Sequence, residues 1–209
     1  RERFCEAHAI DPKRPILVHI GRIAHEKNIE FLLDVLDRVR GKFPDVLMVI
    51  AGEGPARRSL LRKTAALGLQ KNVRSVGYLK RGPELWDCFC AGDAFVFASS
   101  TETQGLVLLE AMALGVPVVS TAVMGTKDIL DAGRGALVAT ETVDDFCGKL
   151  TRLLSDRNLR QRLSVEAHGY AEEWSAERNA ERLVDFYELM LKQHSARSAA
   201  GDIVADPGN

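Results

Sequence analysis

The stretch Thr101-Glu102-Thr103-Gln104-Gly105-Leu106-Val107-Leu108-Leu109-Glu110-Ala111-Met112-Ala113-Leu114-Gly115-Val116-Pro117 decides how this chain is interpreted. An apolar run over 93–98 precedes it and another over 116–120 follows it, and each predicts a buried strand. Between them we expect a helix that starts near Gly105 and ends at Gly115, because glycine commonly follows the last helical residue. Strand, turn, helix and strand in this order are typical of a parallel α/β sheet.

The rest of the chain repeats this alternation, which predicts right-handed βαβ units in a doubly wound, Rossmann-like parallel sheet with helices on both faces. We expect about six strands, over 15–20, 46–51, 73–77, 94–98, 116–120 and 135–139. We expect helices from Ile29 to Gly41 with Asn28 as N-cap, from Pro55 to Gly68, and over 83–91, 105–115, 125–131, 143–155, 158–167 and 176–193. One domain is predicted over 1–194, followed by a disordered tail over 195–209.

The composition is that of an ordinary globular protein, with 46% hydrophobic and 27% charged residues. A formal net charge of −1 excludes a global field that would attract nucleic acid or an anionic membrane. The four cysteines, Cys5, Cys88, Cys90 and Cys147, lack the spacing of a zinc site or of a disulfide pair, so we expect reduced thiols and no metal.

Two carboxylates bracket the turn in the opening stretch. Glu102 lies in the loop before the predicted helix, and Glu110 lies near the start of that helix. Ligands of parallel sheets bind beyond the carboxyl ends of strands, where the first backbone N–H groups of a helix are free. Since ionised carboxylates accept hydrogen bonds from hydroxyls, we expect a polar ligand site here. The alternative is an exposed loop acid and a helix acid that interacts with the helix dipole.

The loop after the first strand contains two cations, Arg22 and Lys27. The planar fork of arginine and the mobile charge of lysine together suit adjacent phosphates, although two ordinary surface cations would give the same pattern. Because carboxylates and phosphates repel each other, a phosphate ligand beside Glu102 and Glu110 would need these cations. We therefore predict that all four side chains converge on one anionic, hydroxyl-bearing ligand.

A dinucleotide-binding loop at Gly52-Glu53-Gly54 is a weaker interpretation. That fingerprint requires a third glycine for close packing of helix on strand, and Arg57 occupies this position. A tight turn before a helix is the better interpretation of this segment.

Several linked motifs resemble the retaining glycosyltransferase family 4 (group 1 glycosyltransferases). They are Gly21-Arg22 followed by Glu26-Lys27, Ala51-Gly52-Glu53-Gly54-Pro55, Asn72-Val73 with Gly77-Tyr78-Leu79, and Glu102 with Glu110-Ala111 ending at Gly115-Val116-Pro117-Val118-Val119. The resemblance spans about Pro15 to Asp131 and implies the C-terminal, donor-binding domain of a GT-B fold, in which two Rossmann-like domains face each other.

The resemblance implies a role for each matching residue. Arg22 and Lys27 would bind the diphosphate, Glu102 would face the hydroxyls of the transferred sugar, and these three form the predicted catalytic set. Glu110 would hold the ribose hydroxyls. The other implied nucleotide-sugar-binding positions are Gly21, Tyr78, Leu79, Thr103, Gly105, Leu106 and Val107, of which Tyr78 and Leu79 would contact the base. No metal and no cofactor is implied.

The implied reaction of the full-length enzyme is transfer of a hexose from a nucleoside diphosphate sugar, UDP-sugar rather than GDP-sugar, to an acceptor with retention of configuration. The segment 101–107 is similar to enzymes that glucosylate diacylglycerol, which makes a membrane lipid the expected acceptor. The basic residues of 57–63 would then form a lipid-facing patch, and a solvated helix face is the alternative.

The expected partners are a nucleotide sugar and an N-terminal acceptor domain of the same enzyme, with no nucleic acid. Arg1 to Asp11 resembles the segment just after the interdomain linker, and Ala176 to Gln193 would be the helix that crosses back to the first domain. We expect a cytoplasmic protein, peripheral at the inner membrane face, whose isolated chain binds nucleotide weakly without transferring sugar. One half of a UDP-sugar epimerase and a non-catalytic nucleotide-binding module remain as alternatives.

Overall fold

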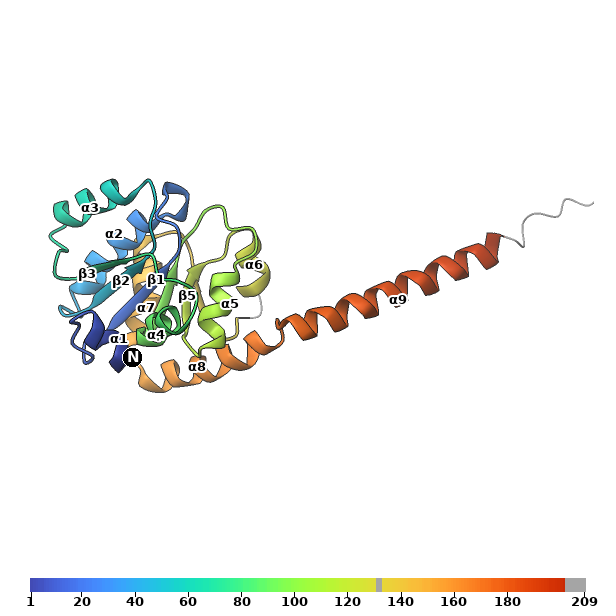
Figure 1. The fold of residues 1–209 in the computed structure, drawn as a ribbon. Helices are drawn as coiled ribbons and strands as arrows, with labels where there is room; N and C mark the ends of the chain where they lie inside the picture. The colour runs from blue at the N-terminus through green and yellow to red at the C-terminus, as the bar shows by residue number, and fades with distance from the viewer. Residues whose placement is uncertain (131–132, 202–209) are drawn as a thin grey trace, which may run out of the picture. The chain divides into compact units, whose positions relative to one another are not determined.

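The structure, a computed structural model, describes residues 1–130 and 133–201 and contains one six-stranded sheet in the order β3-β2-β1-β4-β5-β6 (Figure 1). Every neighbouring pair of strands is parallel. The strands are β1 (Ile16–Ile20), β2 (Leu47–Ala51), β3 (Val73–Gly77), β4 (Ala94–Phe97), β5 (Val118–Thr121) and β6 (Ala136–Ala139). The predicted α/β, doubly wound, six-stranded sheet is confirmed.

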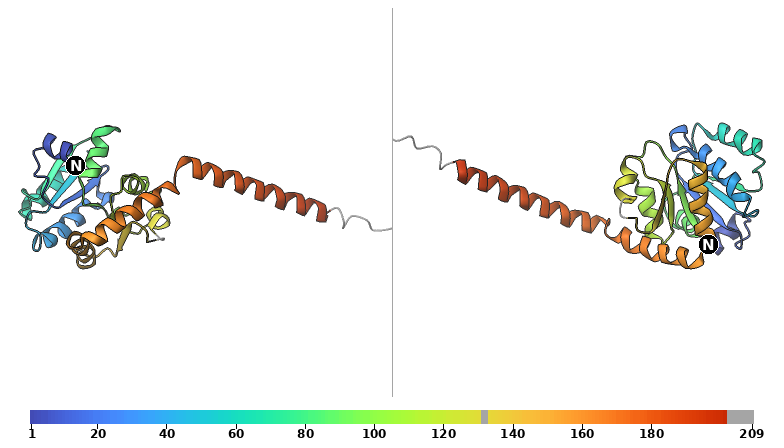
Figure 2. Two further views of the ribbon diagram at one scale, coloured as in Figure 1. Left: turned by 90° about the horizontal axis from the view of Figure 1, so that it is seen from below. Right: turned by 180° about the vertical axis from the view of Figure 1, so that it is seen from behind.

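The helices between the strands lie on both faces of the sheet (Figures 1 and 2). On one face α2 packs against α3 and α7, and elsewhere α1 packs against α4 and α5 against α6. The helices are α1 (Glu2–Ala7), α2 (Ile29–Arg40), α3 (Arg57–Ala66), α4 (Pro83–Ala91), α5 (Leu106–Ala113), α6 (Gly125–Leu130), α7 (Val143–Ser155), α8 (Arg157–Glu172) and α9 (Ala176–Gly201), with a short 3₁₀ turn η1 (His25–Lys27) before α2.

Burial on both faces explains why the central strands are apolar at nearly every position rather than alternating. All five residues of β2 are buried, as are the first four of β1. Helix α2 contributes one apolar face to the same core, and the helical spacing of its buried side chains produces that face. These side chains are Ile29, Leu32, Leu33, Val35, Leu36 and Val39.

The order of the strands brings the two predicted ligand-binding loops together. Strand β1 pairs with β2 on one side and with β4 on the other. Strands β2 and β3 are therefore added toward one edge of the sheet, and β4 to β6 toward the opposite edge. Ligands of open parallel sheets bind at such a switch point, beyond the carboxyl ends of the strands. The loop after β1 carries Arg22 and Lys27, and the loop after β4 carries Glu102.

Several predicted boundaries differ from the observed ones. Helix α3 starts at Arg57 and not at Pro55, because the N–H of Ala56 donates to the carbonyl of Ile23 in the neighbouring loop. Asn28 occupies the predicted N-cap position of α2, but its side chain does not cap the helix: its backbone is left-handed (φ 53°) and its side chain donates to Glu141 instead.

Three helices differ in extent from the prediction. Helix α1 was not predicted, and it buries two apolar residues of the segment 1–11. Helix α8 extends to Glu172 because Tyr170 and Ala171 continue its buried face. Helix α9 continues from the predicted 176–193 to Gly201, through a segment rich in the good helix former alanine. The predicted disordered tail thus falls partly on α9 and partly on 202–209, which lie outside the described residues, as does the predicted last residue of α6, Asp131.

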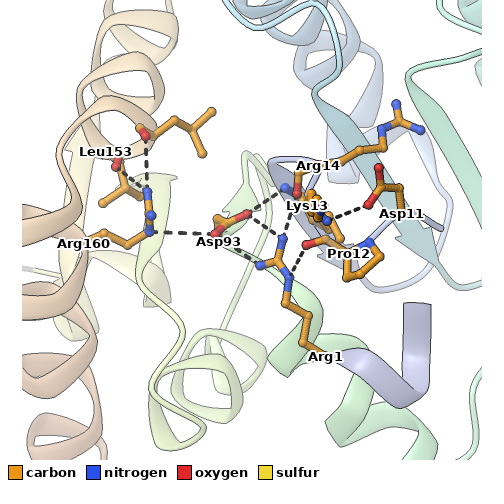
Figure 3. A network of polar contacts seen from close by, with 10 residues as sticks. Arg1, Asp11, Pro12, Lys13, Arg14, Asp93, Leu153 and Arg160 are labelled. Atoms are coloured by element: carbon orange, nitrogen blue, oxygen red, sulfur yellow. Dashed lines mark hydrogen bonds and ion pairs between the residues drawn. The ribbon is translucent and has the colours of Figure 1, made fainter. Parts of the chain in front are cut away.

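A polar network joins segments at the amino-terminal ends of β1 and β4 (Figure 3). The carboxylate of Asp93 accepts hydrogen bonds from the guanidinium of Arg1 (3.2 Å) and from the backbone N–H of Ile16 (2.9 Å). Arg160 of α8 lies 3.7 Å from the same carboxylate and donates to carbonyls at the end of α7. The network joins the N-terminus, β1, β4 and α8 through one largely buried acid.

The chain divides into two compact units, Arg1–Ala171 and Glu172–Asn209. The first unit contains the whole sheet, and the described part of the second is essentially α9. Half-exposed apolar side chains are frequent along α9: Leu183, Val184, Phe186, Tyr187, Leu189, Met190 and Leu191. Within the described residues, no helix combines the length and apolar character needed to cross a bilayer.

Candidate nucleotide-sugar site

An ion pair joins the two predicted ligand-binding loops. The ammonium nitrogen of Lys27 lies 2.8 Å from Oε2 of Glu102, and both side chains are about four-fifths buried. Lys27 comes from the turn after β1 and Glu102 from the loop after β4, so this contact spans the switch point of the sheet. The predicted convergence of the first cation loop with the acid-flanked turn is therefore present in the fold.

The loop that holds Glu102 is fixed by backbone and side-chain contacts. Oε1 of Glu102 accepts a hydrogen bond from the N–H of Gly105 (3.2 Å). The backbone carbonyl of Glu102 accepts one from the N–H of Gly125 at the start of α6 (2.9 Å). Burial of the carboxylate opposes ionisation, but the hydrogen bonds from Lys27 and Gly105 outweigh it, and the pKa of Glu102 lies below its usual value. Glu102 is thus an ionised acceptor at neutral pH.

A cavity of about 390 Å³ opens at the carboxyl ends of β1, β2 and β3, and its lining includes Arg22 from the loop that also leads to Lys27. Its lining combines a mostly apolar wall with the charged side chains of Arg22, Glu53 and Arg81. The full lining is Ile20, Gly21, Arg22, Ala51, Gly52, Glu53, Tyr78, Leu79, Arg81 and Leu85. Four predicted site residues, Gly21, Arg22, Tyr78 and Leu79, therefore share one cavity.

Two glycines in the lining of this cavity pack backbone against backbone. The backbone of Gly52 approaches Gly21 so closely that a β-carbon added at residue 52 would lie 1.9 Å from the carbonyl oxygen of Gly21. The N–H of Gly21 also donates to the carbonyl of Ala51 (3.0 Å), which continues the β1–β2 pairing into the loops. Only glycine fits at residue 52, so the motif predicted here as a tight turn also shapes the cavity.

The other predicted positions lie at or beyond the start of α5. Thr103 and Leu106 are exposed, Val107 is half-buried, and the first N–H groups of a helix have no partner within it. Glycine at residue 105 has an explanation within the fold. Its backbone is left-handed (φ 66°), a conformation that favours glycine, and a β-carbon there would lie 2.9 Å from the end of the Ile129 side chain of α6.

Glu110 has a partner that sequence reasoning missed. A guanidinium nitrogen of Arg81 lies 2.5 Å from Oε1 of Glu110, and Arg81 also lines the cavity. The ion pair thus connects the second predicted acid to the cavity that holds Arg22. Nothing in the spacing of the two residues indicated this pairing, because it joins the β3–α4 loop to α5.

His19 is a second unpredicted feature, close to the ion pair. Its side chain is fully buried, its ring stacks on Phe97 with centroids 6.0 Å apart, and the ammonium of Lys27 lies 6.0 Å from the centroid of that same Phe97 ring. Nδ1 lies 3.1 Å from the carbonyl oxygen of Val96, which can only accept, so Nδ1 carries the proton. Among the described residues Nε2 has no hydrogen-bond partner. Burial and the nearby Lys27 charge lower the pKa of His19 to about 4.

The sequence profile of the family described as "Glycosyl transferases group 1" matches residues 1–169. The chain belongs to this family. The match covers the whole sheet and both loops of the Lys27–Glu102 pair.

Curated relatives and solved structures agree with the family. The chain is 34% identical over 168 residues to sulfoquinovosyl transferase SQD2 of Arabidopsis thaliana, a match that covers 78% of this chain and 31% of the relative. It is 31% identical over 140 residues to the phosphatidylinositol N-acetylglucosaminyltransferase gpi3 subunit of Schizosaccharomyces pombe. This match covers 67% of this chain and 30% of the relative.

The GT-B neighbours include S. aureus TarM, solved in complex with fondaparinux, alpha-GlcNAc-glycerol and UDP. It superposes with a TM-score of 0.75 at 26% identity, covering 82% of this chain and 35% of TarM. The chain thus spans about a third of the length of these three relatives.

Proposed function

We propose that this chain is the donor-binding half of an enzyme that transfers a hexose from a nucleoside diphosphate sugar, with retention of configuration and without a metal. The Lys27–Glu102 contact carries the proposal, because it sets a cation and an ionised acceptor side by side just before α5, while Arg22 of the same β1 loop lines a cavity of about 390 Å³. The TarM complex, which contains UDP, supports UDP-sugar as the donor class.

The charges of the site suit departure of a nucleoside diphosphate. As the sugar–oxygen bond breaks, negative charge builds on the β-phosphate while the sugar becomes oxocarbenium-like. Arg22 and Lys27 would stabilise that charge, assisted by the free N–H groups at the start of α5. By analogy with oxyanion-hole donors, each such group would stabilise the transition state by about 3–4 kcal/mol.

Glu102 would orient the sugar rather than abstract a proton. Its lowered pKa keeps it ionised and therefore a pure hydrogen-bond acceptor for sugar hydroxyls. The bound diphosphate would draw Lys27 toward its oxygens. The released Oε2 of Glu102 would then accept a sugar hydroxyl in place of the ammonium.

The remaining nucleotide contacts follow the cavity. Tyr78 and Leu79 would contact the base, the backbone of Gly21 and of 103–107 would support phosphate and sugar, and Glu110 would hold the ribose hydroxyls. A partly apolar cavity with a few charged groups at its rim suits a flat base joined to a polar tail.

The acceptor site belongs to a second, N-terminal domain in this proposal. Family members matched here are about three times as long as the matched segment, which supports such a domain. Helix α9 would cross to it: the half-exposed side chains of Leu183, Phe186, Tyr187 and Met190 recur at spacings of three and four, as on a helix face that packs against a partner.

A membrane lipid is the proposed acceptor, which would place the enzyme at the cytoplasmic face of a membrane. The relative whose name includes phosphatidylinositol supports this class. The predicted lipid-facing patch on α3 is smaller than expected, because Lys63 is paired with Asp34 at 2.6 Å. Arg57, Arg58 and Arg62 of the patch are exposed.

Calorimetry tests the donor proposal on this chain. Titration with UDP, UDP-glucose and GDP should give heat with at least one uridine nucleotide. Lys27→Gln and Glu102→Gln should each weaken UDP-glucose binding about tenfold, as expected for loss of a charged hydrogen bond. Lys63→Gln removes a lysine from a comparable ion pair between α3 and α2, which does not involve the loops after β1 and β4, and serves as the control. Absence of heat with all three nucleotides would contradict the proposal.

The catalytic half of the proposal needs the enzyme with its acceptor domain. Glu102→Gln should abolish sugar transfer to a lipid acceptor while leaving the melting temperature nearly unchanged. Product analysis distinguishes the alternatives: an epimerase would convert the nucleotide sugar without an acceptor, and a non-catalytic module would leave it intact.

A further inference from the structure

Arg81 has an unusual position for an exposed arginine. Its side chain is 79% exposed, yet it lines the cavity and its guanidinium contacts the carboxylate of Glu110, which is 36% exposed. We propose that Arg81 is a positioning residue that presents the Glu110 carboxylate to the ribose of the nucleotide and thereby sets the preference for ribose over 2′-deoxyribose. The inference rests on the proposed function.

The geometry of the pair leaves one carboxylate oxygen for a ligand. The contact joins Nη2 of Arg81 to Oε1 of Glu110. Among the described residues no hydrogen bond reaches the other oxygen, Oε2. An ionised carboxylate accepts at both oxygens, so a cation on Oε1 fixes the side chain while Oε2 can still accept. A ribose hydroxyl is a donor that suits this remaining acceptor.

The backbone on both sides of Arg81 is held in place. Leu79, two residues before it, is buried, and Pro83, two residues after it, is the first residue of α4. The N–H of Trp86 closes the first turn of that helix on the carbonyl of Gly82. The arginine therefore starts from a fixed point at the cavity rim, and only its side chain is free to adjust.

The surroundings separate this pair from an ordinary surface ion pair. Exposed ion pairs contribute little to stability, so Arg81 is not needed for folding. Its neighbours Tyr78, Leu79 and Leu85 provide the apolar lining that a base requires. A nucleoside with its base on this lining would direct its ribose toward the rim, where the cation and the acid meet.

Calorimetry with UDP and 2′-deoxy-UDP tests the inference. We expect the unsubstituted chain to bind UDP about tenfold more tightly than 2′-deoxy-UDP, the effect of one hydrogen bond to a charged acceptor. In Arg81→Gln, UDP binding should weaken about tenfold, and most of the preference for the ribonucleotide should be lost. Arg81→Lys should restore part of that preference.

Lys80→Gln is the matched control, because it removes an exposed charge one residue away that does not contact Glu110. It should leave both affinities unchanged, and all variants should keep the melting temperature of the unsubstituted chain. The preference ratio is the decisive quantity, because a purely structural role would not change it at constant stability.

Three results would overturn the inference. An unchanged preference ratio in Arg81→Gln would show that the guanidinium does not act through Glu110. Tighter UDP binding by Arg81→Gln would show that it competes with the ribose. Absence of binding of both UDP and GDP by the unsubstituted chain would refute the proposed function together with the inference, whereas normal UDP binding with an indifferent Arg81 refutes the inference alone.

Discussion

Replacement of His19 should change how the stability of the protein depends on pH. In the folded chain the ring is fully buried and its pKa is lowered to about 4, against 6.5 for an unperturbed histidine. Below pH 6.5 the unfolded chain therefore binds a proton that the folded chain does not. Stability falls as the pH decreases, from about 6.5 down to about 4.

The size of the effect follows from these two pKa values. The difference from 6.5 to about 4 corresponds to about 3 kcal/mol in full, and about 2 kcal/mol of it should be lost between about pH 7.5 and about pH 5. For a protein of ordinary stability this is a large fraction of the free energy of unfolding. The nearby charge of Lys27 contributes to this lowering of the His19 pKa, after burial of the ring.

Urea denaturation at a series of pH values measures this loss. His19→Phe keeps a ring that can stack on Phe97, and His19→Asn keeps a donor that can reach the carbonyl of Val96; neither titrates. Both variants should lose about 2 kcal/mol less than the unsubstituted chain over the same pH interval. The difference between chains cancels the other titrating groups. Parallel stability curves for all three chains would refute the reasoning.

Two further substitutions test packing and the amino-terminal network. Gly52→Ala should destabilise the fold by about 3 kcal/mol or more, because the added β-carbon would lie 1.9 Å from a carbonyl oxygen. Gly82 has a similar φ (145° against 142° at Gly52), but a β-carbon there would meet no atom within 4 Å. Gly82→Ala should therefore lower the free energy of unfolding clearly less in the same denaturation assay. Asp93→Ala should cost about 3 kcal/mol by leaving Arg1 and Arg160 without their shared acid; equal stability of this variant would mean that the network in Figure 3 contributes nothing.

The order of elements was predictable from the sequence because the buried strands carry continuous apolar runs and glycines interrupt the chain near many turns. The run 46–51 and the strand β2 differ by one residue, for example. The errors lie where tertiary contacts decide. Asparagine is a preferred residue type at the N-cap, but the backbone of Asn28 is left-handed and its side chain donates a hydrogen bond to Glu141, which is distant in sequence.

In the candidate site, too, some contacts were predictable from the sequence and others depend on tertiary structure. Lys27 and Glu102 were predicted to meet because a phosphate ligand beside carboxylates needs cations, and their contact is present. Arg81 and His19 could not be predicted. Arg81 looks like an ordinary loop cation until α5 brings Glu110 beside it, and His19 lies within a run that is typical of a plain apolar strand. The predicted ligand roles of the site residues remain predictions.

The close contact between Gly52 and Gly21 divides the lining of the cavity into a part that must be inherited unchanged and a part that is free to diverge. Residue 52 has no room for a side chain, whereas Ile20, Arg22, Glu53 and the segment 78–85 contribute side chains to the lining. Since Tyr78, Leu79, Arg81 and Leu85 all come from that one short segment, a graft of 78–85 from a relative would exchange four lining side chains in a single step.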